Sequence, residues 1–148
     1  MIATPHPPET DEPDIDDSKR AVTRALTLFS SFRYAFMGIR YLLWTQRNAK
    51  IHCAIGMIAV ILGMVLPINR VEWVVLILTI ALVLTMEGVN TAIEAIVDLA
   101  SPEYHPLAKV AKDVAAGTVL LAAIASVVVG VIIFLPHLFT LLLWWLQR

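Results

Sequence analysis

Three long apolar runs and one amphipathic stretch before them dominate the pattern of hydrophobic and polar positions along the chain. The runs cover about residues 51–68, 72–100 and 114–136, and a helix needs roughly 20 mostly apolar residues to cross a bilayer core. We therefore expect three transmembrane helices, of which the first is short and the second carries embedded charges. In residues 19–50, apolar side chains alternate with arginines at spacings of three and four, which predicts an amphipathic helix in the lipid headgroup region. The pattern as a whole predicts an all-α membrane protein with one surface helix and three transmembrane helices.

The two ends of the chain differ from this body. Residues 1–18 are acidic and carry four of the eight prolines, so they bury too little apolar surface to offset the entropy of ordering. We expect them to form a disordered tail. Residues 137–148 form an apolar tail with the paired tryptophans Trp144 and Trp145, a composition that suits the membrane interface. The folded domain is therefore placed at residues 19–136.

Charge is distributed unevenly along the chain. Of its 148 residues, 59% are hydrophobic and 16% are charged, and the formal net charge is −1. Six of the 12 acidic residues precede the first basic residue, and seven of the 11 basic residues then precede the first apolar run. The loop between the first two runs has one basic residue, and the loop at residues 101–113 has two. Because lysines and arginines favour the cytoplasmic side, we expect the N-terminus and the 101–113 loop to lie in the cytoplasm.

The same counts argue against two other classes of protein. The single cysteine, Cys53, excludes an intramolecular disulfide and a cysteine-cluster metal site. A basic helix that binds nucleic acid is a competing interpretation of residues 19–50, but the long apolar runs that follow disfavour it. We expect no nucleic-acid partner.

One face of the second apolar run carries four polar residues, which we call the polar stripe. They are Glu87, Asn90, Glu94 and Asp98, at positions that fall within an arc of roughly 80° on a helix. A carboxylate costs about 2.5–3.5 kcal/mol at mid-membrane, so such residues are functional by default. Glu87 and Glu94 are about 10 Å apart along a helix, which suits one residue holding a metal-bound phosphate and the other accepting a proton. The alternative is a structural role, in which the carboxylates pair with basic residues, namely Arg47, Lys50 or Lys112.

The loop at residues 101–113 offers groups suited to a nucleotide, although the chain has no G-x-x-x-x-G-K-[ST] motif. Lys109 and Lys112 supply cations, Glu103 and Asp113 could hold a ribose or a metal-bound water, and Tyr104 could stack on a base. Taken alone, a loop of mixed charges is more often a solvated connector.

Together, the polar stripe and this loop resemble the prokaryotic diacylglycerol kinase family, which includes undecaprenol kinases. The matching pattern is E-x-x-N-x-x-x-E-x-x-x-D, then E-Y-H at residues 103–105, then A-K-D at residues 111–113. Upstream, Tyr34, Gly38, Arg40 and the segment RNAKIH at residues 47–52 also fit. The resemblance covers roughly residues 30–135.

The resemblance implies a homotrimer in the bacterial inner membrane that transfers the γ-phosphoryl group of ATP to a lipid hydroxyl, of diacylglycerol or undecaprenol. By analogy with that family, Glu87 would be the general base, Glu94 would hold Mg²⁺, and Lys112 would neutralise charge on the transferring phosphoryl group. Asn90 and Asp98 would order the site. The remaining residues expected to contact the nucleotide are Tyr34, Glu103, Tyr104, His105 and Asp113. This assignment agrees with the chemistry, because phosphoryl transfer depends mainly on positioning and charge neutralisation.

One position departs from the family pattern. The family carries a second metal-binding glutamate where this chain has Gln46, and we expect Gln46 to lie at the metal and the ATP phosphates. An amide can offer its carbonyl oxygen to Mg²⁺ but supplies no charge.

Two alternative functions belong to other classes. A small cation- or proton-coupled transporter would use the carboxylates of the polar stripe as a relay, but it has no use for the loop motifs. A structural membrane adaptor would need no polar stripe. The lipid kinase is therefore the favoured hypothesis.

Overall fold

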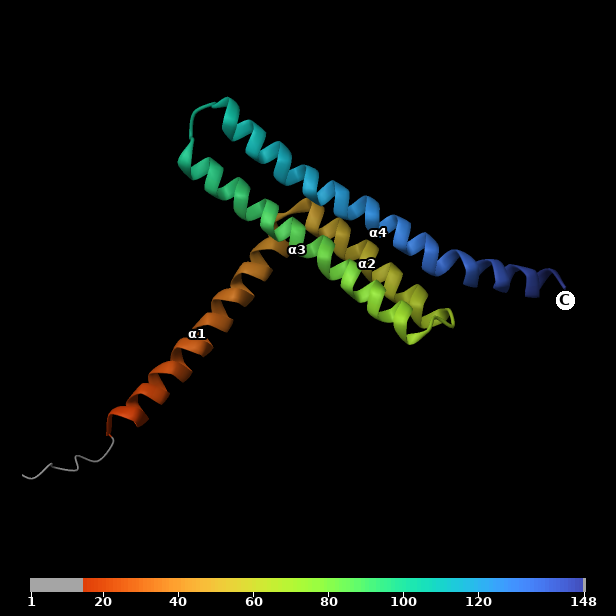
Figure 1. The fold of residues 1–148 in the computed structure, drawn as a ribbon, viewed down its shortest axis with the longest axis horizontal. Coiled ribbons are helices and arrows are strands. Elements are labelled where there is room, and N and C mark those ends of the chain that lie inside the picture. Colours follow the sequence, from red (N-terminus) through yellow and green to blue (C-terminus); the bar gives the residue numbers. More distant parts are fainter. Residues whose placement is uncertain (1–14, 148) are drawn as a thin grey trace, which may run out of the picture. The chain divides into compact units, whose positions relative to one another are not determined.

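The computed structural model describes residues 15–147, with side chains from residue 27 onward, and its regular secondary structure over that range is α-helical (Figure 1). Its helices are α1 (Ile15–Thr45), α2 (Arg47–Val65), α3 (Arg70–Ala100) and α4 (Pro106–Leu146). By length and composition, α2, α3 and α4 are each able to cross a membrane. The prediction of an all-helical protein with three such segments is confirmed.

The chain divides into two compact units, Met1–Gly38 and Ile39–Arg148, and α1 contributes to both. In the part of α1 before Gly38, the aromatic side chains of Phe29, Phe32 and Phe36 are exposed. The surface location of this helix stays a prediction. Most of the predicted disordered tail lies outside the described residues, and residues 15–18 of it are helical.

Local sequence signals define the ends of the helices around the two loops. Asn69 caps α3 by accepting hydrogen bonds from the backbone N–H groups of Val71 and Glu72, and the Glu72 carboxylate accepts a hydrogen bond from the Asn69 backbone N–H. This reciprocal arrangement is a capping box, and it satisfies donors that a helix N-terminus otherwise leaves free. At the other loop, the His105 ring nitrogen Nδ1 accepts from the backbone N–H of Leu107, and Pro106 is the first residue of α4.

Two polar contacts fix the register of the antiparallel pair α3 and α4. Lys112 pairs with Asp98 next to the α3–α4 loop, and His137 lies 3.8 Å from Glu72 at the opposite end of α3. Asp98 is 26 residues after Glu72 on α3, and His137 is 25 residues after Lys112 on α4. Because the two spacings match, the helices stay in register over their shared length. The buried cluster that contains Leu76 on α3 together with Ile133 and Phe134 on α4 has the same register.

Helix α4 is longer than the third predicted span. We expected a loop at residues 101–113, a span at 114–136 and a separate tail beyond it. The structure instead has one helix that begins at Pro106, inside the expected loop, and continues through Pro136 to Leu146. Pro136 has no N–H group, so the Ile132 carbonyl loses its helical donor, but the neighbouring bonds persist and the helix does not end.

Candidate active site

The polar stripe lies on one face of α3, as its spacing predicted, and burial decreases along it. Glu87 is 2% exposed and Asn90 is 6% exposed, whereas Glu94 is partly buried and Asp98 is exposed. The end of the stripe near the middle of α3 is therefore dry, and the end near the α3–α4 loop is open to solvent.

Hydrogen bonds connect some members of the stripe and leave two buried oxygens unused. The Asn90 side chain donates from Nδ2 to Glu94 Oε1 at 2.9 Å, and Thr91 donates its hydroxyl to the Glu87 backbone carbonyl at 2.9 Å. Within the described part of the chain, Glu87 Oε2 and Asn90 Oδ1 are buried without a partner. A buried acceptor without a donor is unfavourable by about 1–3 kcal/mol. The pair is therefore suited to receive a donor from a ligand.

Small residues on α4 make room for the stripe. Ala115, Val119 and Ala122 are buried on α4 at spacings of four and three, so they share one face of that helix. The register of α3 and α4 places Ala122 opposite Glu87 and Val119 opposite Asn90. Their short side chains allow the polar groups to lie between the two helices.

The end of α1 packs against α3 next to the stripe, and Gln46 follows one turn later along the chain. Leu42 Cδ2 is 3.6 Å from the position that a Cβ on Gly88 would take, so this turn of α1 packs against α3 next to Glu87. Gln46 follows one turn later, donates its backbone N–H to the Leu42 carbonyl at 3.0 Å, and has extended backbone angles where α1 ends and α2 begins. Its side chain makes no capping hydrogen bond to α2, so its amide oxygen is not used by the helix.

A pocket of about 450 Å³ lies where α3, the α3–α4 loop and the start of α4 meet. We call it the loop pocket. Its lining comprises Val97, Asp98, Ser101, Pro102, Glu103, Tyr104, His105, Ala108, Lys109, Lys112 and Asp113. The loop pocket therefore brings Asp98 together with five residues that the sequence predicted to act on ATP, namely Glu103, Tyr104, His105, Lys112 and Asp113.

Four charged side chains of the loop pocket form two ion pairs. Lys112 forms an ion pair with Asp98, and Lys109 Nζ is 2.5 Å from Asp113 Oδ2. All four side chains are at least one-third exposed, and exposed ion pairs are worth only about 0–1 kcal/mol. Both lysines can therefore exchange a carboxylate for a phosphate at little cost. The structural alternative for the stripe applies to Asp98, whose partner is Lys112, and not to the buried Glu87.

The expected magnesium ligands fit the donor set that this metal uses. Among the described residues, no three His, Cys, Asp or Glu side chains gather closely enough to bind a metal ion without help. Mg²⁺ is usually held by one or two carboxylates together with substrate phosphates, and the Glu94 carboxylate and the Gln46 amide oxygen are donors of the kind that it accepts. Asn90 uses Glu94 Oε1 and leaves Oε2 for this role.

Two contacts at the site were not predicted, and one predicted residue is not placed with the others. Lys109 joins the loop pocket through Asp113, and the capping role of His105 was not foreseen. The sequence signal for Lys109 was its position four residues before Asp113, a spacing that favours an ion pair on a helix. Tyr34 lies in the other unit, where the Arg33 guanidinium is 5.8 Å from its ring centroid.

Comparison with known proteins identifies similar chains. The sequence profile described as prokaryotic diacylglycerol kinase matches residues 33–134. The diacylglycerol kinase of Synechocystis sp. is 46% identical over 125 residues, which cover 84% of this chain and 71% of that protein. The undecaprenol kinase of Bacillus subtilis is 40% identical over 122 residues, which cover 82% of this chain and 99% of that protein. The diacylglycerol kinase of Escherichia coli K12 is 32% identical over 104 residues, which cover 70% of this chain and 85% of that protein. The resemblance found in the sequence is confirmed, and the profile match ends before Pro136.

Proposed function

Because the chain belongs to the prokaryotic diacylglycerol kinase family, we propose that it transfers the γ-phosphoryl group of ATP to the hydroxyl group of a membrane lipid. The observation that carries this proposal is the buried Glu87 carboxylate on the same helix face as the residues that lead to the loop pocket. A dry carboxylate with one unused oxygen suits a general base for a lipid hydroxyl, and the loop pocket suits the nucleotide. Diacylglycerol and undecaprenol are the two acceptor classes.

The reaction balances with groups of this chain. Glu87 accepts the proton of the lipid hydroxyl while the hydroxyl oxygen bonds to the γ-phosphorus of ATP. The bond between that phosphorus and the bridging oxygen breaks, and ADP leaves with the electron pair. Lys112 neutralises charge on the transferring group, and Asp98 holds Lys112 in position. Glu103, Tyr104, His105 and Asp113 bind the nucleotide in the loop pocket. The family resemblance alone adds Tyr34 to this set.

Mg²⁺ is the metal that this arrangement would use, held by Glu94 and Gln46. When bound, it neutralises charge on the ATP phosphates. Asn90 orders the site by holding Glu94 through the 2.9 Å hydrogen bond from its Nδ2.

An apolar cavity whose lining reaches to within one helical turn of Glu87 provides a place for the acceptor lipid. It measures about 240 Å³ and lies between α2, α3 and α4, with His52, Val83 and Gly130 among its lining residues. Val83 is one helical turn before Glu87 on α3. A lipid chain in this cavity would leave the hydroxyl group near the carboxylate.

The reaction takes place at the cytoplasmic face of the bacterial inner membrane. Support comes from the basic residues before α2 and in the loop pocket, which favour the cytoplasmic side. We further propose that the enzyme is a homotrimer, as the family resemblance implies.

The test is transfer of labelled phosphate from ATP to lipid by the purified protein, with diacylglycerol and undecaprenol as separate acceptors. Glu87→Gln is expected to lower the rate at least about 100-fold, because general-base catalysis contributes roughly 10²–10⁴-fold. Glu72→Gln is the matched control, since it makes the same change on the same helix outside the site and should leave the rate unchanged. No transfer to either lipid by the unmodified protein contradicts the proposal, and ion flux across reconstituted vesicles would then favour the transporter.

A further inference from the structure

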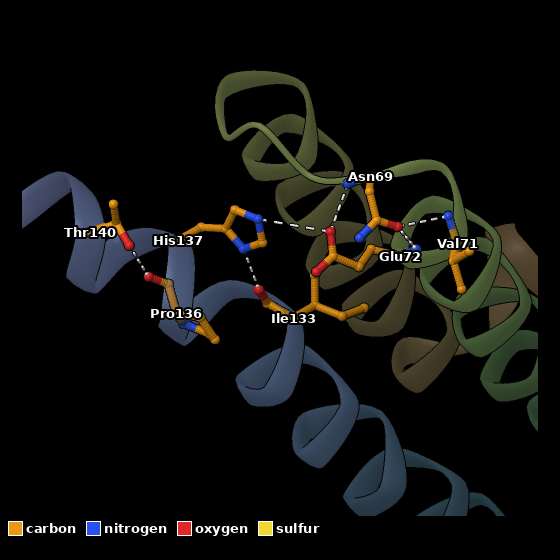
Figure 2. Close-up of polar contacts among 7 residues, drawn as sticks. All are labelled: Asn69, Val71, Glu72, Ile133, Pro136, His137 and Thr140. Carbon is orange, nitrogen blue, oxygen red and sulfur yellow. Dashed lines mark hydrogen bonds and ion pairs between the residues drawn. The ribbon is translucent and has the colours of Figure 1, made fainter.

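A polar cluster at the end of α3 farthest from the loop pocket joins α3 to α4 (Figure 2). Glu72 Oε2 accepts the Asn69 backbone N–H at 2.6 Å and lies 3.8 Å from His137 Nε2. The other ring nitrogen, Nδ1, is 2.8 Å from the Ile133 carbonyl, so the ring is held on both sides. His137 lies outside the region that matches the family profile, and none of these residues has a place in the proposed active site.

The distance of this cluster from the loop pocket compares closely with the thickness of a membrane. The helical distance between the Glu72–His137 contact and the Asp98–Lys112 pair is about 38 Å on either helix, at 1.5 Å per residue. The hydrocarbon core of a bilayer is about 30 Å thick, and the headgroup layers extend this to about 40–45 Å. Two polar contacts about 38 Å apart therefore fall within the two headgroup layers, one at each end of the span.

Helix α4 continues beyond this boundary for nine more residues, 138–146, which we call the C-terminal segment. A straight helix would extend about 13 Å farther, out of the headgroup layer and into water. Eight of the nine residues are apolar, and their exposed fractions range from 43% to 74%. A straight course would thus place the most exposed apolar part of α4 in the least favourable solvent.

The chain contains a means of redirecting the C-terminal segment at the point where it leaves the boundary. Pro136 lies immediately before His137 and removes one hydrogen bond from the helix. Proline is one of the few established causes of a sharp helix bend. The Thr140 hydroxyl donates to the Pro136 carbonyl at 2.9 Å, so the first turn after the proline stays helical (Figure 2).

We propose that the C-terminal segment is a membrane-surface helix that turns at Pro136 and lies along the lipid headgroup layer at the α2–α3 end of the spans. Lipid is the partner that fits, because the segment continues directly from a transmembrane helix and carries no charged side chain. Its paired tryptophans, Trp144 and Trp145, are the residues most enriched in headgroup layers. The Glu72–His137 contact holds the start of the segment at that depth.

Depth measurements along α4 test this proposal. Single cysteines would be placed at Phe139, Leu142 and Leu146 in full-length protein that carries Cys53→Ala, and each would receive a nitroxide spin label. The protein would be reconstituted in vesicles of phosphatidylethanolamine and phosphatidylglycerol, and depth would be read from collisions with oxygen and with a water-soluble nickel complex. Matched control labels at Leu120, Val127 and Val131 lie on the exposed surface of the span itself.

The surface helix and the straight helix give different depth profiles. The control labels should change depth by about 1.5 Å per residue, whereas the three labels on the C-terminal segment should agree within about 5 Å at headgroup depth. Pro136→Ala should restore a gradient of about 10 Å between positions 139 and 146.

Three results would overturn the proposal. A continuous gradient into water in the protein with Pro136 would show a straight helix. Spin–spin coupling between copies would show that a second chain covers the segment. Labels shielded from both oxygen and the nickel complex would show a protein partner.

Discussion

Burial separates the four residues of the polar stripe into two pairs. Glu87 and Asn90 are buried, whereas Glu94 is partly exposed and Asp98 is exposed. A carboxylate in a dry site is poorly solvated and readily accepts a proton, while carboxylates at a wet site can exchange one cation for another. The proposed roles, proton acceptor for Glu87 and cation handling for Glu94 and Asp98, follow this division.

Restoring a charge at Gln46 should strengthen the magnesium site. Gln46→Glu is expected to lower the Mg²⁺ concentration for half-maximal activity by about three- to tenfold, since 1.4 kcal/mol corresponds to about tenfold in an equilibrium. The measurement is lipid phosphorylation at fixed ATP over a series of Mg²⁺ concentrations. Gln147→Glu adds the same charge at the far end of α4 and is the control. Equal Mg²⁺ curves for all three proteins would place Gln46 away from the metal.

The two lysines of the loop pocket should differ in their kinetic effects. Lys112→Ala is expected to lower kcat about 100-fold or more, because removing one group that stabilises transition-state charge typically costs about 10²–10³. Lys109→Ala in the same pocket should act mainly on the KM for ATP, since Lys109 is paired with Asp113 and not with a residue of the polar stripe. Steady-state kinetics with ATP as the varied substrate separate the two effects. A fall in kcat of similar size for both variants would contradict a special role for Lys112.

At the scale of helices, the features that were predictable depend on local pattern. The spacing of Glu87, Asn90, Glu94 and Asp98 was sufficient to place them on one helix face. Glu72, in contrast, had no assigned role, although its position three residues after Asn69 is the signature of a capping box. Its contact with His137 was beyond prediction, because two residues 65 positions apart meet only when packing has set the register of α3 and α4.

Pro136 shows that a local sequence signal can also predict a helix end that the structure does not have. The local rule places proline at the end of a helix, and it led to a predicted boundary between residues 136 and 137. The observed helix continues, since one missing hydrogen bond does not outweigh the bonds on either side. Helix existence was therefore predictable from the apolar runs, whereas helix length depended on surroundings that the sequence pattern does not contain.

Close packing of α2 against α3 depends on glycine. A Cβ on Gly63 would lie 2.9 Å from Ile68 Cδ1 and 3.0 Å from the Trp73 ring, whereas a Cβ on Gly117 would meet nothing within 4 Å in the described chain. Gly63→Ala is expected to lower the free energy of unfolding by about 1–3 kcal/mol, the usual cost of overpacking. Gly117→Ala, the control, should raise it by about 0.5–1 kcal/mol through helix propensity.

The measurement for this pair is unfolding in mixed micelles with increasing sodium dodecyl sulfate, followed by circular dichroism. Equal stability of the two variants would show that α2 and α3 do not approach closely at Gly63.

At the scale of the whole molecule, a single chain is sufficient to bury the inner end of the polar stripe. Glu87 and Asn90 are buried within the described chain without a second copy. Other subunits are therefore not needed to bury the proposed base. Large apolar side chains remain exposed along α2, α3 and α4, among them Met57, Leu78 and Leu121. These surfaces are available to lipid and to neighbouring subunits.

Because Glu87 is buried within one chain, the proposed trimer should not depend on its carboxylate. Light scattering of the purified protein in detergent should give a protein mass of three chains of 16.4 kDa each, for the unmodified protein and for Glu87→Gln alike. The substitution keeps the volume of the side chain and removes a charge that lies inside one chain, so it should not change contacts between chains. A monomeric mass for the unmodified protein would contradict the trimer. Dissociation of Glu87→Gln alone would show that the carboxylate holds subunits together, and the loss of its activity would then no longer identify it as the base.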